Sequence, residues 1–317
     1  MRAEYAPLAE TLVPVTIVGG DSHAGKSTLL GYLLAHHQGP PLAVMVSESS
    51  ASFIETNLVA GRDGEFLTLG NGSLVRAADD EYSSALSMLQ HRQPQPSRVF
   101  LEAAGAARLR GMAGYGYMPG YRSDGIVVVV DAETIRERAV ALDDSTRVMG
   151  QLACADIVVV NKIDRLTASA RSSVTQWLTS VFPGVRVIET SFGRVPSELL
   201  VGVGPEDAMR DMRVLNSTWE TTFRPNSKKE RVPTVGDTAP QPRLWLHTTP
   251  DPITTQGFRA WADRLPGTIV RARGSVYVRE DVFYRYEFEL VGRRYHFQRA
   301  ARWEDTAPET RLALVGL

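Results

Sequence analysis

The chain has 317 residues, of which 43% are hydrophobic and 22% charged, a composition typical of a globular protein long enough for two domains. Lys and Arg total 35 against 36 for Asp and Glu, so the net charge of -1 gives no support for a nucleic-acid or acidic-membrane partner. A single cysteine, Cys154, excludes an intrachain disulfide and a zinc site built from several cysteines. The N-terminus does not resemble a signal peptide and no apolar run is long enough to span a membrane, so we expect a cytoplasmic protein.

Short apolar, β-branched segments alternate with helical patterns over the first two thirds of the chain. Most of them are apolar throughout, as strands buried on both faces are, which predicts a parallel sheet covered by helices. We therefore predict a doubly wound, mostly parallel α/β domain over residues 1–222. The predicted strands are Val13–Val18, Leu42–Val46, Arg98–Leu101, Ile126–Val130, Ile157–Val160 and Val185–Ile188, and the predicted helices are Lys26–His36, Asp79–His91, Asp143–Ala153 and Ala168–Val181.

The pattern changes in the last third of the chain. Residues 223–242 are polar and rich in proline, which predicts a flexible linker. Residues 243–317 then alternate apolar and polar side chains, which predicts a smaller α+β domain whose sheet has one face toward water. Its expected elements are a helix at Thr254–Leu265 and strands at Arg243–His247, Thr268–Val278, Val282–Leu290, Arg293–Gln298 and Leu312–Val315.

The segment Gly20–Ser27 has the spacing of a phosphate loop between a predicted strand and a predicted helix. Its backbone N–H groups and the helix N-terminus can cradle phosphates, while Lys26 reaches the β and γ oxygens. The Ser27 hydroxyl can ligate Mg2+, and Thr28 is placed to contact the α-phosphate. A chance glycine-rich turn is the alternative, and His23 points either to the phosphates or to solvent. The candidate nucleotide-binding residues of this segment are Gly20, Ala24, Gly25, Lys26, Ser27 and Thr28.

Asn161-Lys162-Ile163-Asp164 follows a predicted buried strand and indicates guanine recognition. Asp164 can accept two hydrogen bonds from the N1–H and N2–H2 edge of guanine, a pair of donors that adenine lacks. Asn161 can bond the base or hold the loop, and the stem of Lys162 can lie along the ring. The alternative is that Asp164 merely caps the next helix. Ser191, in the segment 190–193, is the expected second wall of the base pocket.

Acidic side chains follow three of the predicted strands. Glu102 can hold Mg2+ through water, next to a Gly105 N–H that can face the γ-phosphate; otherwise it is a surface glutamate. Glu48 can order the attacking water or bind a second ion, or it is an exposed charge. We expect Asp131 to cap a helix rather than support the site. Lys26, Glu102 and Glu48 are thus the candidate catalytic residues, and Ser27 and Glu102 the candidate magnesium ligands.

The order of these motifs resembles that of the CobW-type P-loop GTPases, and the resemblance extends from about Val13 to Gly316. The segments that carry it are 25–30 (Gly-Lys-Ser-Thr-Leu-Leu), 47–48 (Ser-Glu), 101–105 (Leu-Glu-Ala-Ala-Gly), 151–156 (Gln-Leu-Ala-Cys-Ala-Asp), 161–164, 270–274 (Val-Arg-Ala-Arg-Gly) and 311–316 (Arg-Leu-Ala-Leu-Val-Gly). The resemblance implies a slow GTPase that uses Mg2+ and delivers a metal or cofactor to a client protein. It also implies that the chain can form a homodimer.

One departure from this family concerns its metal motif, Asn-Gly-Cys-x-Cys-Cys. The corresponding segment 71–76 has Ser73, Val75 and Arg76 in place of the three cysteines, and thiolates are what give such a site its high affinity for Zn2+. His36 and His37 diverge on a helix, so we interpret them as a helix end. Binding of Zn2+ or another transition metal is therefore only weakly supported.

Three functions remain open. The first is a GTP-dependent switch that acts as a metallochaperone-like or enzyme-activating accessory protein. The second is a GTP-gated scaffold that has lost metal binding. The third is a P-loop kinase of small molecules, which Asp164 argues against because such kinases usually take ATP. The sequence identifies neither the client nor the metal.

Overall fold

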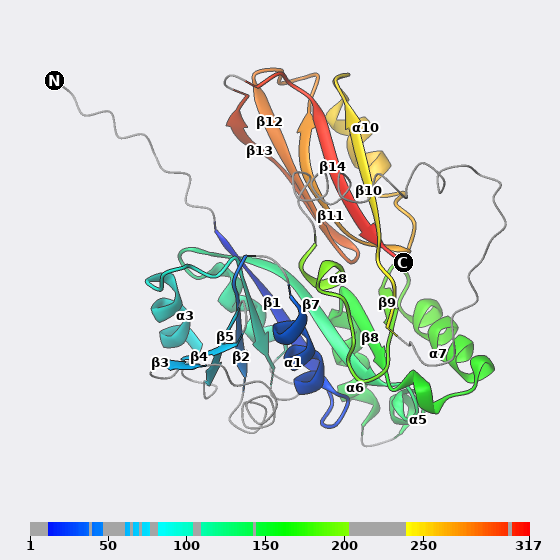
Figure 1. Ribbon diagram of the computed structural model, residues 1–317. Helices are drawn as coiled ribbons and strands as arrows, with labels where there is room; N and C mark the ends of the chain where they lie inside the picture. Colours follow the sequence, from blue (N-terminus) through cyan, green and yellow to red (C-terminus); the bar gives the residue numbers. More distant parts are fainter. Residues whose placement is uncertain are drawn as a thin grey trace, which may run out of the picture.

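The computed structural model describes residues 12–37, 40–46, 61–63, 66–69, 72–76, 82–103, 109–141, 144–202, 239–303 and 306–317. They form two sheets, which belong to two domains stacked on each other (Figure 1). The predicted linker lies almost entirely outside these residues, so its boundaries stay a prediction. No helix in the described ranges combines the length and the apolar character needed to cross a membrane.

The first domain is built on a nine-stranded sheet in the order β3-β4-β5-β2-β6-β1-β7-β8-β9. Neighbouring strands are parallel from β5 to β9, and only the β3–β4 and β4–β5 pairs are antiparallel. The predicted doubly wound, mostly parallel fold is thereby confirmed. The strands are β1 (Val13–Gly20), β2 (Leu42–Val46), β3 (Gly61–Asp63), β4 (Phe66–Leu69), β5 (Gly72–Arg76), β6 (Arg98–Glu102), β7 (Tyr121–Asp131), β8 (Ile157–Asn161) and β9 (Arg186–Glu189).

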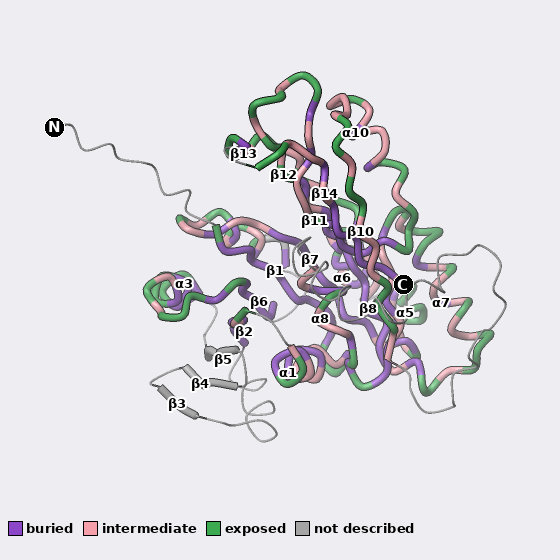
Figure 2. Tube along the Cα trace, turned by 45° about the horizontal axis from the view of Figure 1, so that its top comes forward, coloured by how far each residue is buried: buried purple, intermediate pink, exposed green. Residues whose placement is uncertain are grey.

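Helices cover both faces of this sheet, and its central strands are buried along their length (Figure 2). One apolar core packs the sheet against α3 to α7, and a second packs it against α1, α8 and the strands of the second domain. The helices are α1 (Lys26–His36), α3 (Tyr82–Gln90), α4 (Leu109–Met112), α5 (Ile135–Val140), α6 (Ser145–Cys154), α7 (Ala168–Val181) and α8 (Ser197–Val201).

The predicted strands of the first domain and its longer helices agree closely with the structure, whereas several short elements were not predicted. The predicted bounds of α1, β2 and α7 are those observed. The strands β3, β4 and β5 and the helices α4, α5 and α8 were not predicted from the sequence. The missed strands lack the continuous apolar run that marks β2, and the missed helices hold less than two turns, so their periodicity is weak.

The second domain is an antiparallel five-stranded sheet in the order β10-β14-β11-β12-β13, which confirms the predicted smaller α+β unit. The helix α10 (Thr255–Ala262) begins after Thr254, whose hydroxyl accepts a hydrogen bond of 3.0 Å from Gly257 N. Phe258 of this helix packs on Phe288 and Phe297 of the sheet. The strands are β10 (Arg243–Thr249), β11 (Ile269–Tyr277), β12 (Tyr284–Val291), β13 (Arg294–Arg302) and β14 (Thr310–Gly316).

A buried group of charges joins the two domains. Arg98, Asp124 and Arg271, which we call the interdomain charge cluster, have side chains that are 3%, 0% and 2% exposed. Arg271 donates to both oxygens of Asp124 at 2.9 and 2.8 Å, Arg98 pairs with the same carboxylate, and Thr16 Oγ1 donates to it at 2.6 Å. Burial alone would raise the pKa of Asp124, but the two guanidinium groups outweigh it and hold that pKa well below its usual range.

Two further ties surround this cluster. Arg98 donates to the Val201 carbonyl at 3.0 Å and Arg271 to the Leu200 carbonyl, so both arginines hold the end of α8. At the start of β8, Arg294 of the second domain donates to Asp156 Oδ1 at 2.6 Å. These contacts lie at the amino ends of β6, β7 and β8. The second domain therefore packs against the amino ends of these strands. The loops that carry the nucleotide motifs follow the carboxyl ends of the strands, on the opposite side of the first domain.

Candidate nucleotide site

The phosphate loop begins where β1 ends and finishes where α1 starts. Gly20 and Gly25 have φ angles of 131° and 105°, which side chains other than glycine rarely adopt. A Cβ at Gly20 would lie 2.1 Å from the Val129 carbonyl oxygen, and one at Gly25 would lie 2.2 Å from Asn161 Nδ2. Neither position has room for a side chain, so both glycines are required by this loop.

Lys26 folds back over the loop. Its Nζ donates to the carbonyl oxygens of Gly20 at 3.1 Å and Asp21 at 3.0 Å. Burial lowers the pKa of Lys26, and the nearby carboxylates of Glu102 and Asp21 oppose that shift. The ammonium group is thus held by carbonyl oxygens that the oxygens of a phosphate can replace. His23 is exposed and has a φ of 65°.

Glu102 ends β6 beside the phosphate loop, in register with Val18 of β1. The residue is only 3% exposed, which excludes the alternative of a surface glutamate. Its Oε2 atom is buried and has no hydrogen-bond partner among the described residues. Its backbone carbonyl oxygen accepts a hydrogen bond of 2.9 Å from the Tyr82 hydroxyl. A buried carboxylate oxygen without a donor is costly, and a hydrated divalent cation would satisfy it. The residues present therefore fit Mg2+. Glu48 and Gly105 lie outside the described residues.

Asn161 connects the phosphate loop to the segment after β9. Its Nδ2 donates to the Ala24 carbonyl at 2.9 Å, and its Oδ1 accepts from Gly193 N at 3.0 Å. Of the two roles the sequence left open, the structure shows the one in which Asn161 holds the loop. Gly193 needs to be glycine here, because it has a φ of 62° and a Cβ would lie 2.7 Å from Leu29 N.

Asp164 lies in the turn of a short 3-10 helix, Ile163–Arg165, and is exposed. Its backbone N–H donates to Ser191 Oγ at 3.1 Å, so the two predicted walls of the base pocket are in contact. The helix α7 is capped by Thr167, whose hydroxyl accepts from Ala170 N, and not by Asp164. The cap was the alternative to base recognition for Asp164, and the structure excludes it.

Lys162 is fixed at the edge of this pocket. It has a φ of 65°, and its Nζ pairs with Asp131 Oδ2 at 2.6 Å. The other oxygen of Asp131 accepts from Glu133 N at 3.0 Å, whereas the residue at the cap position of α5 is Thr134. The expectation that Asp131 caps the helix was wrong, because its carboxylate supports Lys162 and the turn before α5.

Two arginines that carry no signal in the sequence also belong to this site. Arg138 of α5 and Arg147 of α6 both pair with the carboxylate of Asp21, inside the phosphate loop. Asp21 itself was noted only as a member of the loop. No local pattern marks either arginine, because charged residues on short helices usually face water. Only the packing of α5 and α6 against the loop brings them to it.

The segment that corresponds to the family's metal motif includes β5, which pairs with β2 in parallel and with β4 in antiparallel register. Asn71 lies outside the described residues, and only the backbone is described at Ser73, Val75 and Arg76. His36 ends α1 and stacks on Tyr32, as expected for a helix end. Within the described ranges, no group of three or more His, Cys, Asp or Glu residues could hold a metal ion.

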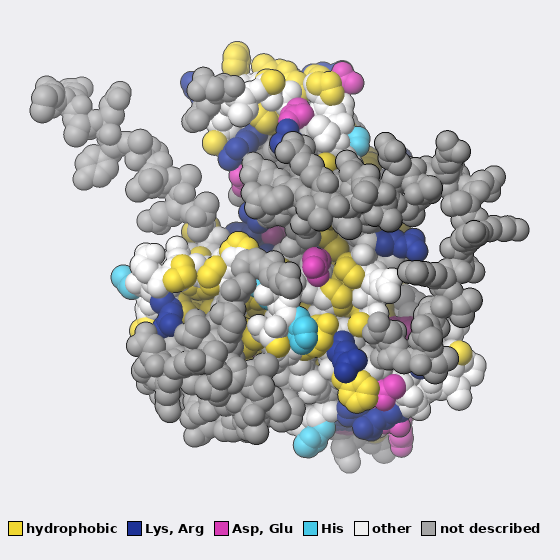
Figure 3. Space-filling model, viewed as in Figure 1, with side chains coloured by type: hydrophobic (Ala, Val, Ile, Leu, Met, Phe, Trp, Pro, Cys, Tyr) yellow, Lys and Arg dark blue, Asp and Glu magenta, His cyan; other side chains and the backbone are white. Residues whose placement is uncertain are grey.

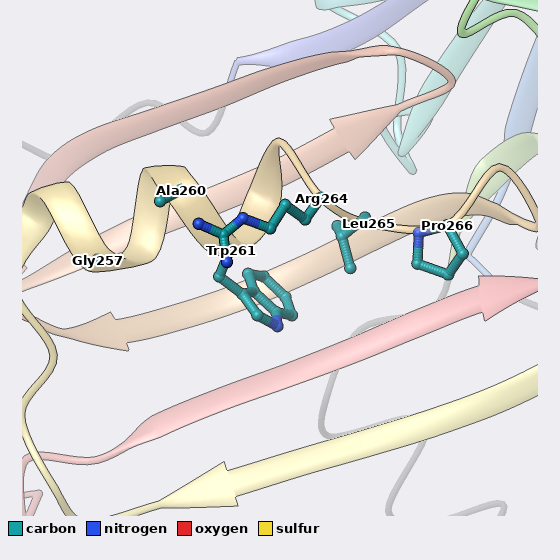
Figure 4. Close-up of a pocket in the computed structure, with 6 residues that line it drawn as sticks. All are labelled: Gly257, Ala260, Trp261, Arg264, Leu265 and Pro266. Atoms are coloured by element: carbon teal, nitrogen blue, oxygen red, sulfur yellow. The ribbon is translucent and has the colours of Figure 1, made fainter.

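The second domain has a surface hollow that is separate from the nucleotide motifs. Its volume is about 420 Å³, and it lies beside α10 and the segment that follows this helix (Figure 4). Its lining consists of Gly257, Ala260, Trp261, Arg264, Leu265 and Pro266, of which only Arg264 is charged. On the face of the molecule drawn in Figure 3, described charges of both signs are interspersed, without a large area of one sign. Neither feature has the converging polar groups of the phosphate loop.

Comparison with known proteins agrees with this geometry. Residues 14–189 match the family described as CobW/HypB/UreG, nucleotide-binding domain, and residues 243–317 match the cobalamin synthesis protein cobW C-terminal domain. A zinc chaperone CobW of Pseudomonas aeruginosa is 28% identical over 240 residues, which cover 65% of this chain and 64% of the relative.

A zinc-regulated GTPase metalloprotein activator 1 of Schizosaccharomyces pombe is 28% identical over 201 residues, covering 59% of this chain and 48% of the relative. The chain thus spans about half to two thirds of the length of these curated relatives. The crystal structure of the Zn(II)-bound YjiA GTPase from E. coli aligns with a TM-score of 0.49 and 20% identity, over 96% of this chain and 94% of that one.

Proposed function

The chain belongs to the CobW/HypB/UreG family of nucleotide-binding domains, and on this premise we propose that it binds GTP with Mg2+, hydrolyses it slowly and uses the nucleotide state to control a client protein. One observation carries the nucleotide part. The Asn161 amide joins Ala24 of the phosphate loop to Gly193, beside Ser191 and Asp164. These contacts support the proposal, because they connect the phosphate loop to the backbone of Asp164, whose carboxylate suits the donor edge of guanine.

Each residue of this site has a definite task in the proposal. Lys26 exchanges the carbonyl oxygens of Gly20 and Asp21 for the β and γ oxygens of the nucleotide. Ser27 and Glu102 would hold Mg2+, which would neutralise phosphate charge when bound. Asp164 accepts from the guanine edge, and Ser191 fixes the backbone on which Asp164 sits. Gly20, Ala24, Gly25, Thr28, Asn161 and Lys162 complete the proposed nucleotide site, and Glu48 is a candidate for ordering the attacking water.

The client side of the proposal rests on the relatives. They are named as zinc chaperones and as a zinc-regulated activator of metalloproteins, so we infer that this chain is an accessory protein for a metalloenzyme or another enzyme. Ser73, Val75 and Arg76 favour a second candidate, a GTP-gated scaffold without metal transfer, because none of them supplies a thiolate. The chain can pair with a second copy in either case.

Nucleotide binding is tested by calorimetric titration of the full chain with GTP, GDP and ATP in the presence of Mg2+. We expect GTP and GDP to bind and ATP to bind far more weakly. Lys26→Ala should remove GTP binding, whereas the control Arg136→Ala, on the exposed side of α5, should leave it unchanged. Equal GTP binding by the wild type and Lys26→Ala would overturn the proposed site.

A second titration separates the two candidate functions. Zn2+, Co2+ and Ni2+ are added to the protein with GTP or GDP bound, and both metal binding and phosphate release are measured. Submicromolar binding that changes the hydrolysis rate supports the metal-delivering accessory protein. Binding no tighter than millimolar for all three metals supports the scaffold and removes metal transfer from the proposal.

A further inference from the structure

The phosphate loop contains an acidic residue where it should receive a strongly negative ligand. Asp21 directly follows Gly20 and is 7% exposed. Its carboxylate is close enough to Lys26 to oppose the lowering of the lysine pKa that burial causes. An unneutralised carboxylate inside the phosphate loop would repel the phosphates of a nucleotide, because charges interact strongly in partly buried surroundings. The loop therefore needs a device that neutralises Asp21.

Two arginines from neighbouring helices supply opposite charge. Arg138 Nη1 lies 2.8 Å from Asp21 Oδ2, and Arg147 donates to Asp21 Oδ1. Both arginines also donate to Asp144, from Arg138 Nε at 2.7 Å and from Arg147 Nε at 2.9 Å. The four residues, which we call the Asp21 cluster, have two positive and two negative charges. Hydrogen bonds from Arg147 and Arg138 lower the pKa of Asp144 and so favour its charged form.

The members of the Asp21 cluster differ in how deeply they are buried. Asp21 is the most buried member, with 8% of its side chain exposed, while those of Arg138, Arg147 and Asp144 are 31%, 38% and 25% exposed. Lys26 donates to the backbone carbonyl of Asp21, and the carboxylate is taken up by the two arginines. The lysine is thus left available for phosphate.

We propose that Arg138 and Arg147 are positioning residues of the nucleotide site: they neutralise Asp21 and hold its carboxylate, so that the phosphate loop can accept a triphosphate. This inference rests on the proposed GTP binding and concerns residues outside the recognised motifs. Because the effect is electrostatic, it should grow with the charge of the ligand. Loss of the arginines should therefore weaken GTP more than GDP, and GDP more than GMP.

The decisive experiment is a charge rescue. The double variant Arg138→Gln/Arg147→Gln keeps long polar side chains but leaves Asp21 without its counter-charges. Its Kd for GTP at low salt should rise about 10- to 100-fold, with a smaller rise for GDP. Adding Asp21→Asn to that variant removes the uncompensated charge and should restore most of the GTP affinity. High salt should reduce the loss of GTP affinity in the double variant, because added ions screen the repulsion between Asp21 and the phosphates.

Arg136→Gln is the matched control, because Arg136 lies on the same helix and donates to Ser173 at 2.7 Å, away from the cluster. Thermal unfolding is recorded for every variant, and the single variants Arg138→Gln and Arg147→Gln replace the double variant if it does not fold. Equal losses for GTP and GDP without rescue by Asp21→Asn, or no loss at all, would overturn this inference alone. A wild-type chain that binds no nucleotide would overturn the proposed function, and this inference with it.

Discussion

Replacing Asp124 by Asn should strongly destabilise the protein. The substitution keeps the shape of the side chain but removes the negative charge between Arg98 and Arg271. Both arginines are almost completely buried, so neither can turn toward water to recover hydration. They would be left as two like charges in contact with one neutral amide.

The size of the effect follows from burial and from the number of partners. Breaking a buried ion pair by removing one member costs about 3–5 kcal/mol, because the remaining charge is uncompensated. Here one carboxylate serves two arginines and accepts a third hydrogen bond from Thr16, so we expect the upper part of that range. Glu289, 3.8 Å from Arg98 and paired with Arg122 at 2.5 Å, offsets only part of the loss.

Urea unfolding followed by circular dichroism measures this effect in the full chain. Asp124→Asn should lower the free energy of unfolding by about 3–5 kcal/mol at pH 7. The control Glu287→Gln removes an exposed charge from the 3.7 Å pair with Arg285, and it should cost less than about 1 kcal/mol. Thr16→Val, which removes one hydrogen bond to the same carboxylate, should cost about 1–3 kcal/mol and serves if Asp124→Asn does not fold.

The same carboxylate predicts a dependence on pH. Because the pKa of Asp124 is depressed in the folded state, its contribution is present above the unfolded pKa of about 3.9 and is lost as pH falls below it. The difference in stability between the wild type and Asp124→Asn should thus stay constant between about pH 5 and pH 8 and shrink below about pH 4. A difference under about 1 kcal/mol at pH 7, or one that grows in acid, would refute the reasoning.

Four further predictions concern the nucleotide site. Asp164→Asn should weaken GTP about 100-fold or more while sparing xanthosine triphosphate, and equal losses of both would mean that Asp164 does not contact the base. Gly25→Ala should weaken GTP roughly 10- to 100-fold in a titration, because its Cβ meets Asn161 Nδ2 at 2.2 Å; unchanged affinity would contradict the required glycine. Asn161→Ala should weaken GTP and GDP alike, since it releases the loop rather than one phosphate, and a loss confined to GTP would argue against this. Glu102→Gln should raise the Mg2+ concentration needed for half-maximal hydrolysis about tenfold or more, and an unchanged Mg2+ dependence would remove Glu102 from the metal site.

The local features of this protein could be predicted from its sequence. The apolar segments predicted β2, and the helical patterns predicted α1 and α7, because a strand buried on both faces leaves a continuous apolar run and a long helix leaves its period in consecutive residues. The phosphate loop and the Asn161–Asp164 segment were likewise recognisable, since each places its functional groups within a few neighbouring positions. The doubly wound sheet and the smaller second domain followed from the order of these elements.

Which distant groups meet could not be predicted in this way, and it became visible in the folded chain. Asn161 lies between the phosphate loop and Gly193, where the sequence allowed either the base or the loop. Asp21 lies between the arginines of α5 and α6, and Asp124 between β6 and the second domain, neither of which any local pattern indicated. The physical reason is that the partners of a buried charge depend on which strands and helices become neighbours. A charged residue on a short element has the same local pattern whether it faces water or the core.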